Sequence, residues 1–165
     1  MLRDASADAA VVVVDAVHGA EVITEKVWDE AAVIDLPCVV VLNRLDRGRG
    51  SLQRSLESLQ SAFGRTVVPI QLPIGVEAEL RGVVDLVAMK AITFGDDGRA
   101  VSIEEVPDEL AAEASAAREA LIELVAEADD RLMEQFFAAI TLTQEELLVG
   151  LQIATCRAAR GAPGV

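Results

Sequence analysis

The sequence has 165 residues, 52% of them apolar, and a formal net charge of −14. This length can bury a hydrophobic core and suits one domain, or one domain with an insertion, and the apolar content excludes a disordered chain. No apolar run approaches the ~20 residues that cross a bilayer, and no basic start precedes an apolar stretch with a cleavage site, so we expect a cytoplasmic protein with no membrane partner.

The first half of the chain predicts strands and helices in alternation. Residues 9–15 (AAVVVVD) and 38–42 are β-branched apolar runs, typical of strands buried on both faces. Residues 21–35 and 51–64 are amphipathic and predict helices, and residues 66–72 predict a third strand. This order is typical of a parallel α/β sheet with right-handed crossovers.

The pattern changes after residue 73. Residues 82–94 and 99–103 predict short strands on either side of a Gly-Asp-Asp-Gly turn, which is a hairpin signal. Helices are then predicted at residues 108–128, 130–138 and 143–158, the last opening with the capping box Thr-Gln-Glu-Glu. The predicted fold class is therefore α/β, with a second, inserted subdomain.

Cysteine and histidine give no sign of a reactive or metal-binding centre. Cys38 lies in a predicted strand and Cys156 in a predicted helix, and neither has a neighbouring His or Cys at metal-ligand spacing. We interpret both as packing thiols. The single histidine, His18, is expected to have no partner and to lie in a loop rather than act as a ligand or base. The sequence therefore predicts no catalytic residue and no metal site.

The polar run Asn43-Arg44-Leu45-Asp46 directly follows the second predicted strand. Ligands of open α/β sheets bind outside the carboxyl ends of the strands. The Asp46 carboxylate can accept two hydrogen bonds at once, as the ring N1–H and the amino group of guanine would require, whereas adenine offers no such pair. Asn43 can meet the purine's acceptors, and the stem of Arg44 can lie over the nucleotide. The same letters also fit a turn that caps a helix, so both interpretations stay open here.

Four segments together carry a resemblance to a known family: AAVVVVDAVHGAEVITEKVW, LPCVVVLNRLDR, SLQSAFGRTVVPIQLPIG and GVVDLVAMKAITF. They resemble elongation factor G, a bacterial translational GTPase, and the resemblance runs from about Leu2 to Ala158. It implies the second half of a P-loop-GTPase-like domain at residues 1–72, its G′ insertion at 73–160 and a truncated tail at 161–165.

The resemblance also implies site residues, cofactors and partners. The family reads guanine through Asn-Lys-x-Asp, so Asn43, Arg44 and Asp46 take that role, with Arg44 in place of the usual Lys. The whole factor would bind GTP or GDP with magnesium and hydrolyse GTP on the ribosome to drive translocation.

A phosphate-binding loop is missing from this sequence. Such a loop needs Gly-x-x-x-x-Gly-Lys-Ser/Thr, and neither Lys26 nor Lys90 fits that motif. The family's Asp-x-x-Gly switch and catalytic His would lie upstream, and its Ser-Ala loop beyond the end. We therefore expect a fragment that neither hydrolyses GTP nor binds it tightly. A partial gene, a split or decayed gene and a trimmed chain all fit this expectation.

Acidic residues are concentrated in the second half of the chain. Residues 1–75 carry 10 acidic and 7 basic side chains, whereas residues 76–165 carry 18 and 7. This balance disfavours direct nucleic-acid binding and favours a basic partner.

A cluster of three acidic residues lies near the end of the predicted helix 108–128. If helical phase continues, Glu123, Glu127 and Asp130 fall within about 60° of one another. Periodicity alone fits a solvated surface. The family resemblance instead implies contact with the C-terminal domain of the ribosomal stalk protein.

Three functions follow from these patterns. The first is a fragment of elongation factor G, with the ribosome, the stalk protein and GTP as partners of the whole factor. The second is a non-catalytic acidic adaptor that binds the stalk protein. The third is an unrelated α/β domain in which Asn43 and Asp46 only form a turn.

Overall fold

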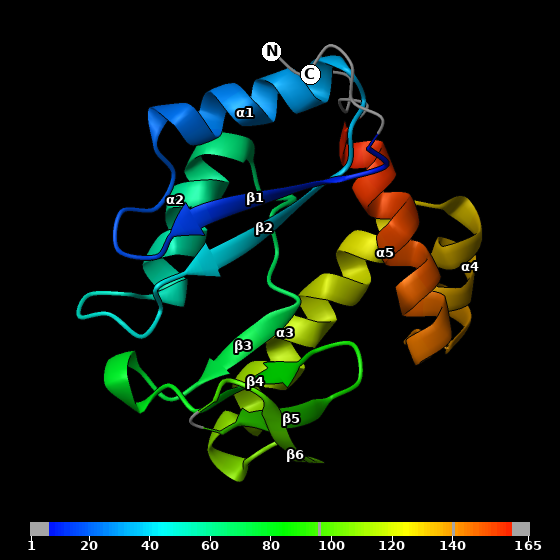
Figure 1. Cartoon of the computed structure of the whole chain (residues 1–165). Helices are drawn as coiled ribbons and strands as arrows, with labels where there is room; N and C mark the ends of the chain where they lie inside the picture. The colour runs from blue at the N-terminus through cyan, green and yellow to red at the C-terminus, as the bar shows by residue number, and fades with distance from the viewer. Residues whose placement is uncertain (1–6, 96, 140, 160–165) are drawn as a thin grey trace.

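The computed structural model describes residues 7–95, 97–139 and 141–159. Two sheets organise these residues, a parallel pair of strands and a four-stranded antiparallel sheet (Figure 1). The fold is therefore mixed α/β, as predicted. None of the helices in the described part of the chain has the length and apolar character to cross a bilayer.

The parallel unit consists of two strands and two helices. β1 (Ala10–Asp15) pairs in parallel with β2 (Cys38–Asn43), from Ala10 opposite Cys38 to Asp15 opposite Asn43. α1 (Val22–Val33) connects the strands, and α2 (Leu52–Phe63) follows β2. Both strands and both helices were predicted, which confirms the alternating pattern at the start of the chain.

The core of the parallel unit lies between one face of the strands and the two helices. Val12 and Val14 of β1 and Leu59 of α2 are its buried residues. Trp28 of α1 stacks on Phe63 of α2, with ring centroids 4.4 Å apart. Together these contacts hold both helices against the same side of β1 and β2.

The opposite face of these strands is open, so the prediction that both strands are buried on both faces is wrong. On β1, Val11 and Val13 are 65% and 62% exposed, and on β2, Val39 and Val41 are 41% and 44% exposed. Side chains alternate between the faces of a strand, and α1 and α2 cover only one of them. The β-branched runs therefore predicted the strands correctly, but they did not show which faces of the strands are buried.

The predicted third strand of the parallel sheet is also wrong. Residues 66–70 form no strand, and β3 (Gln71–Ile74) pairs antiparallel with β4 (Gly82–Asp85) in the other sheet. Pro69 has no N–H to donate to a ladder, which disfavours a strand through this segment. The predicted subdomain boundary after residue 72 falls within β3 and stays a prediction.

The antiparallel sheet continues from β4 through β5 (Lys90–Phe94) to β6 (Ala100–Glu105). β5 and β6 pair as the predicted hairpin, although Asp96 of its turn lies outside the described residues. Between β4 and β5, a tight turn forms because the Asp85 carboxylate accepts the N–H groups of Val87 and Ala88 at 2.8 and 3.1 Å. Residues 82–94 therefore contain two strands.

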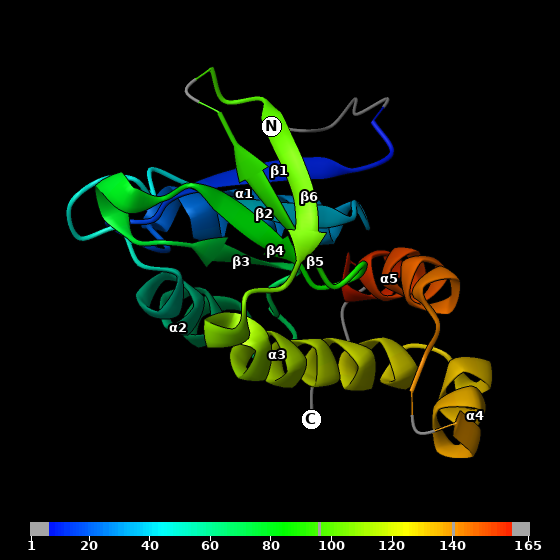
Figure 2. The same cartoon turned by 90° about the horizontal axis from the view of Figure 1, so that it is seen from below.

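Three helices complete the chain: α3 (Asp108–Glu127), α4 (Asp130–Ala139) and α5 (Gln144–Ala159). All three were predicted within one or two residues. Figure 2 shows α3 running beneath the antiparallel sheet, with α4 and α5 near its C-terminal end. The buried side chains between these elements form the larger core: Leu72, Ile74, Val84, Leu86, Ala91, Ala114, Leu121, Ile122, Val125, Leu132, Leu142 and Leu147.

Local signals explain where several helices begin and end. Ser51 accepts the N–H of Arg54 at 3.3 Å and caps the start of α2, and Gly64, at φ +91°, ends it. Before α5, the predicted capping box is confirmed. There Glu146 accepts the Thr143 N–H at 2.8 Å, and the Thr143 hydroxyl accepts the Glu146 N–H at 3.3 Å.

Candidate functional site

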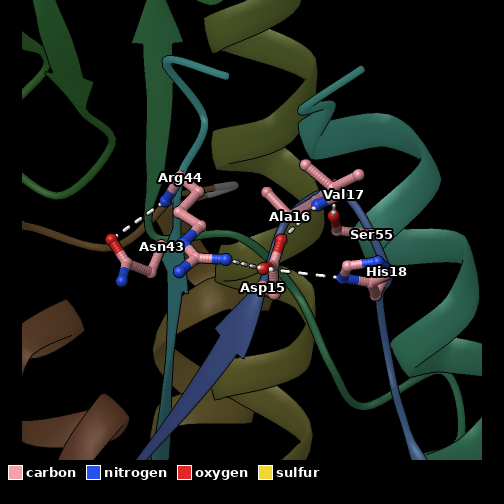
Figure 3. A network of polar contacts seen from close by, with 7 residues as sticks. All are labelled: Asp15, Ala16, Val17, His18, Asn43, Arg44 and Ser55. Carbon is pink, nitrogen blue, oxygen red and sulfur yellow. Dashed lines mark hydrogen bonds and ion pairs between the residues drawn. The ribbon is translucent and has the colours of Figure 1, made fainter. Parts of the chain in front are cut away.

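Asp15 and Asn43 are the last residues of β1 and β2, and they lie opposite each other in the parallel register. The two strands therefore bring both polar side chains to one edge of the sheet (Figure 3). Ligands of parallel sheets bind at this edge, beyond the strand ends.

Asp15 connects the residues around this edge. Its Oδ2 atom lies 2.9 Å from Nη1 of Arg44 and 3.5 Å from Nδ1 of His18, and its Oδ1 atom accepts the Val17 N–H at 2.8 Å. The Val17 hydrogen bond, with the hydrogen bond and positive charge of Arg44, lowers the pKa of Asp15 despite the opposing effect of its burial. The group is therefore a carboxylate at neutral pH.

Asn43 holds the start of the loop that follows β2. Its Oδ1 atom accepts the N–H of Arg44 at 2.9 Å. Arg44 has φ +63°, which turns the chain sharply away from the strand. The side chain of Asn43 is exposed, and within the described residues its Nδ2 group has no hydrogen-bond partner. Asn43 thus braces the loop through its oxygen while its amide nitrogen can still donate to a ligand.

Arg44 and Asp46 differ in how firmly they are held. The guanidinium of Arg44 is tied to Asp15, so its stem lies along the sheet edge. The Asp46 carboxylate is exposed, and the nearest cation is the Arg47 Nε atom at 3.9 Å. Such an exposed pair contributes little energy, so the carboxylate remains available to a ligand.

Ala16 ties the loop and α2 to the end of β1. Its N–H donates to the carbonyl of Asn43 at 2.9 Å, and its carbonyl accepts the Ser55 hydroxyl at 3.1 Å and the Ser51 N–H at 3.4 Å. Ser55 is buried, at 1% exposure. The base of the candidate site is therefore a hydrogen-bonded frame that joins both strands to α2.

Asp15 and Ser55 belong to this site but were not predicted from the sequence. Asp15 ends its apolar run just as Asn43 ends the next one. This shared position at the end of a predicted strand could have identified Asp15 as a site residue. Ser55 gave no signal, because a serine inside an amphipathic helix normally faces solvent. His18 lies in a loop, as predicted, but it has Asp15 as a partner.

The structure describes the side chain of Cys38 but not that of Cys156. Cys38 is partly buried in β2, its Sγ lies 3.5 Å from the Leu36 carbonyl, and burial raises the pKa of the thiol. These observations agree with a packing role. Cys156 belongs to α5, and its side chain lies outside the described residues.

The three acidic residues that the resemblance assigns to the stalk-protein contact, Glu123, Glu127 and Asp130, lie away from this edge. Glu123 and Glu127 are exposed on α3, and Asp130 is exposed as the first residue of α4. Asp129 interrupts the helical phase between them, because its carboxylate accepts the Arg131 N–H at 3.0 Å and caps α4. In Figures 1 and 2 the carboxyl ends of β1 and β2 point away from α4, so the loop after β2 and the end of α3 are separate surfaces.

Comparison with known proteins connects this arrangement to a family. Residues 3–150 match the family described as Elongation factor Tu GTP binding domain. This chain belongs to that family. The expected relationship to the GTPases of translation is therefore confirmed at the level of this domain.

A solved structure supports the same relationship. The chain resembles the crystal structure of a protein from Thermus thermophilus, with a TM-score of 0.81 and 32% sequence identity. The match covers 93% of this chain and 23% of that protein. The chain therefore spans about a quarter of the length of the protein it matches, and its family membership concerns the GTP-binding domain.

Proposed function

We propose that this chain carries the guanine-recognition part of elongation factor G, the GTPase that drives translocation on the ribosome. The observation that carries the proposal is the exposed Asn43 and Asp46 pair beside the carboxyl ends of two parallel strands, in a member of a GTP-binding family. Asp46 accepts the N1–H and amino groups of guanine, and the amide nitrogen of Asn43 donates to an acceptor of the purine. The whole factor would act in the cytoplasm, with GTP and the ribosome as partners.

Arg44 supplies a platform beside the base in this proposal. Its ion pair with Asp15 fixes the guanidinium, so the aliphatic stem is held in place before a ligand arrives. A fixed side chain loses less conformational freedom on binding than a free one. Arg44 thereby replaces the lysine that the family resemblance leads one to expect.

GTP hydrolysis belongs to the whole factor in this proposal. Magnesium would accompany the phosphates there, but the residues of this chain do not fit a magnesium site. The sequence has no phosphate-loop motif, and no three His, Cys, Asp or Glu side chains cluster in the described part of the chain. We therefore assign no catalytic step to these residues.

A titration followed by NMR tests the guanine site. Labelled chain is titrated with GMP, AMP and XMP at millimolar concentration. We expect GMP, and not AMP, to shift the amide signals of residues 43–46. In Asp46→Asn the preference should move to XMP, because xanthine carries a carbonyl where guanine has its amino group. A bidentate base contact is worth ~1–3 kcal/mol, which makes the change measurable. Equal responses to GMP and AMP would refute the proposal.

A second function, stalk-protein binding, rests on a separate observation. Glu123, Glu127 and Asp130 are all exposed, while Leu121 and Val125 of the same helix are fully buried. These carboxylates can meet a basic surface without disturbing the core. A non-catalytic adaptor that binds the C-terminal domain of the stalk protein would need only this surface.

A further inference from the structure

We propose that Glu77 is a positioning residue for the guanine-reading loop and couples that loop to the antiparallel sheet. This inference rests on the guanine site proposed above. Glu77 opens a short 3-10 turn, η1 (Glu77–Glu79), which follows β3. Its Oε1 atom accepts the backbone N–H of Arg49, in the loop after β2, at 2.9 Å. In Figures 1 and 2 the green turn after β3 lies beside the cyan loop after β2.

Both residues of this contact have unusual backbone conformations. Arg49 has φ +77° and Glu77 has φ +48°, in the left-handed region that residues with a side chain rarely adopt. Such conformations cost energy and persist only where surrounding contacts hold them. Arg49 belongs to the parallel unit and Glu77 belongs to the antiparallel unit, and the hydrogen bond between them helps to maintain both backbone conformations.

The backbone is also tightly packed at one glycine beside each of these residues, Gly50 next to Arg49 and Gly75 near Glu77. A β-carbon at Gly50 would lie 2.7 Å from the carbonyl oxygen of Arg44, and one at Gly75 would lie 2.1 Å from the carbonyl oxygen of Glu79. Neither Gly50 nor Gly75 can therefore be replaced by a larger residue unless the backbone moves. Because both turns are compact, a shift of one is transmitted to the other through the hydrogen bond between them.

The loop between Arg44 and Gly50 is held at both ends and at Arg49. Arg47 donates its N–H to the Arg44 carbonyl at 3.1 Å, and Gly50 donates to Arg47 at 2.8 Å. The Arg49 carbonyl accepts the guanidinium of Arg54, from α2. Glu77 supplies the contact on the other side of Arg49, and it comes from the antiparallel unit.

The consequence concerns Asp46, which lies within this loop and has no strong contact of its own among the described residues. Its position relative to Asn43 depends on the path of residues 44–50, and Glu77 helps to set that path. Glu77 does not touch the base in this scheme. Movement of the antiparallel sheet would change guanine affinity through Glu77.

Four variants of the labelled chain test this role: Glu77→Ala, Glu77→Gln, Glu79→Ala and Asp46→Asn. Glu79 lies in the same turn and is exposed, and its side chain forms no hydrogen bond or ion pair within residues 7–95, 97–139 and 141–159, so its removal is a matched change of charge. Two properties are measured by NMR: solvent exchange of the Arg49 amide, and the affinities for GMP and AMP. Amide exchange in β1 reports whether the fold itself has changed.

Glu77→Ala should speed exchange of the Arg49 amide about fivefold and weaken GMP binding by up to the same factor, as expected for one hydrogen bond. AMP binding and exchange in β1 should not change. Glu77→Gln keeps an acceptor oxygen, so it should retain most of the protection of the Arg49 amide and most of the GMP affinity. Glu79→Ala should match the unaltered chain in both measurements.

Two outcomes would overturn the inference in distinguishable ways. If Asp46→Asn removes the preference for GMP while Glu77→Ala leaves GMP binding intact, the guanine site stands and Glu77 has no role in it. If the unaltered chain shows no preference for GMP over AMP, the proposed guanine site is wrong, and the role of Glu77 in guanine recognition is wrong with it.

Discussion

Asp15 and Arg44 form an ion pair of 2.9 Å between the carboxyl ends of two parallel strands, although they stand 29 positions apart in the sequence. Arg44 lies in the left-handed region, and Asp15 holds its guanidinium back over the sheet edge. The residue that the sequence motif presents as a contact for a nucleotide is therefore already part of an internal network. This network gives the site a pH dependence that can be measured.

Asp15→Asn should lower the free energy of unfolding at neutral pH, and this difference from the unaltered chain should shrink in acid. The pKa of Asp15 is lowered in the folded protein from the ordinary value of 3.8, mainly by the Val17 N–H and then by Arg44. A group with a lowered folded pKa stabilises the fold above its unfolded pKa, and the stabilisation disappears as the pH falls through the folded pKa. Urea unfolding at pH 7 and at about pH 3 measures the difference between the two proteins. A difference that stays constant with pH would mean that the charge of Asp15 is not responsible.

The chain by itself should bind GDP only weakly. Backbone amides and the lysine of a phosphate loop supply much of the affinity for nucleotides, and this sequence lacks the motif. Calorimetry with GDP at micromolar protein should therefore detect no binding, and no GTP hydrolysis should be seen. A sub-micromolar dissociation constant would contradict the prediction and would point to phosphate contacts outside the known motif.

Reversal of the acidic residues Glu123, Glu127 and Asp130 to Lys should abolish binding to the stalk protein's C-terminal domain. All three side chains are exposed, so helical content should stay unchanged. Contacts between exposed charges are weak and screened by salt, so binding of the unaltered chain should also fade as salt rises. NMR titration of labelled stalk domain at low and moderate salt measures both effects.

A control with the same change in net charge separates a specific surface from bulk charge. Glu79, Glu104 and Glu113 are exposed and lie elsewhere on the chain, so their reversal to Lys leaves the three acidic residues untouched. If this control weakens binding as much as the first variant, only net charge matters.

Neighbouring valines of β1 should respond differently to the same substitution. Val14 is 2% exposed, and Val14→Thr places a hydroxyl in the core, which should cost about 1–3 kcal/mol of unfolding free energy. Val13 is 62% exposed on the open face, and Val13→Thr should change stability by no more than about 0.5 kcal/mol. Threonine keeps the β-branched shape in both variants, so urea unfolding compares burial alone. Equal losses would show that the open face is covered in solution.

Much of the local structure could be predicted because its causes lie close together in the sequence. The valine run of β1 and the spacing of apolar residues in α3 specify a strand and a helix by their periods. Ser51, Gly64 and the Thr143 capping box mark helix ends through contacts with residues one turn away. The Asn43 to Asp46 motif was also visible, because its residues are neighbours.

Only the tertiary structure decided which surfaces meet. The sequence could not show that β3 leaves the parallel unit, that Val11 and Val13 stay open, or that Asp15 reaches Arg44. Strand pairing and burial depend on elements far away in the chain, and the same apolar run fits a covered or an open face. The hydrogen bond between Glu77 and Arg49 is the clearest case, because an exposed glutamate and a loop arginine carry no sign of each other until the fold brings their turns together.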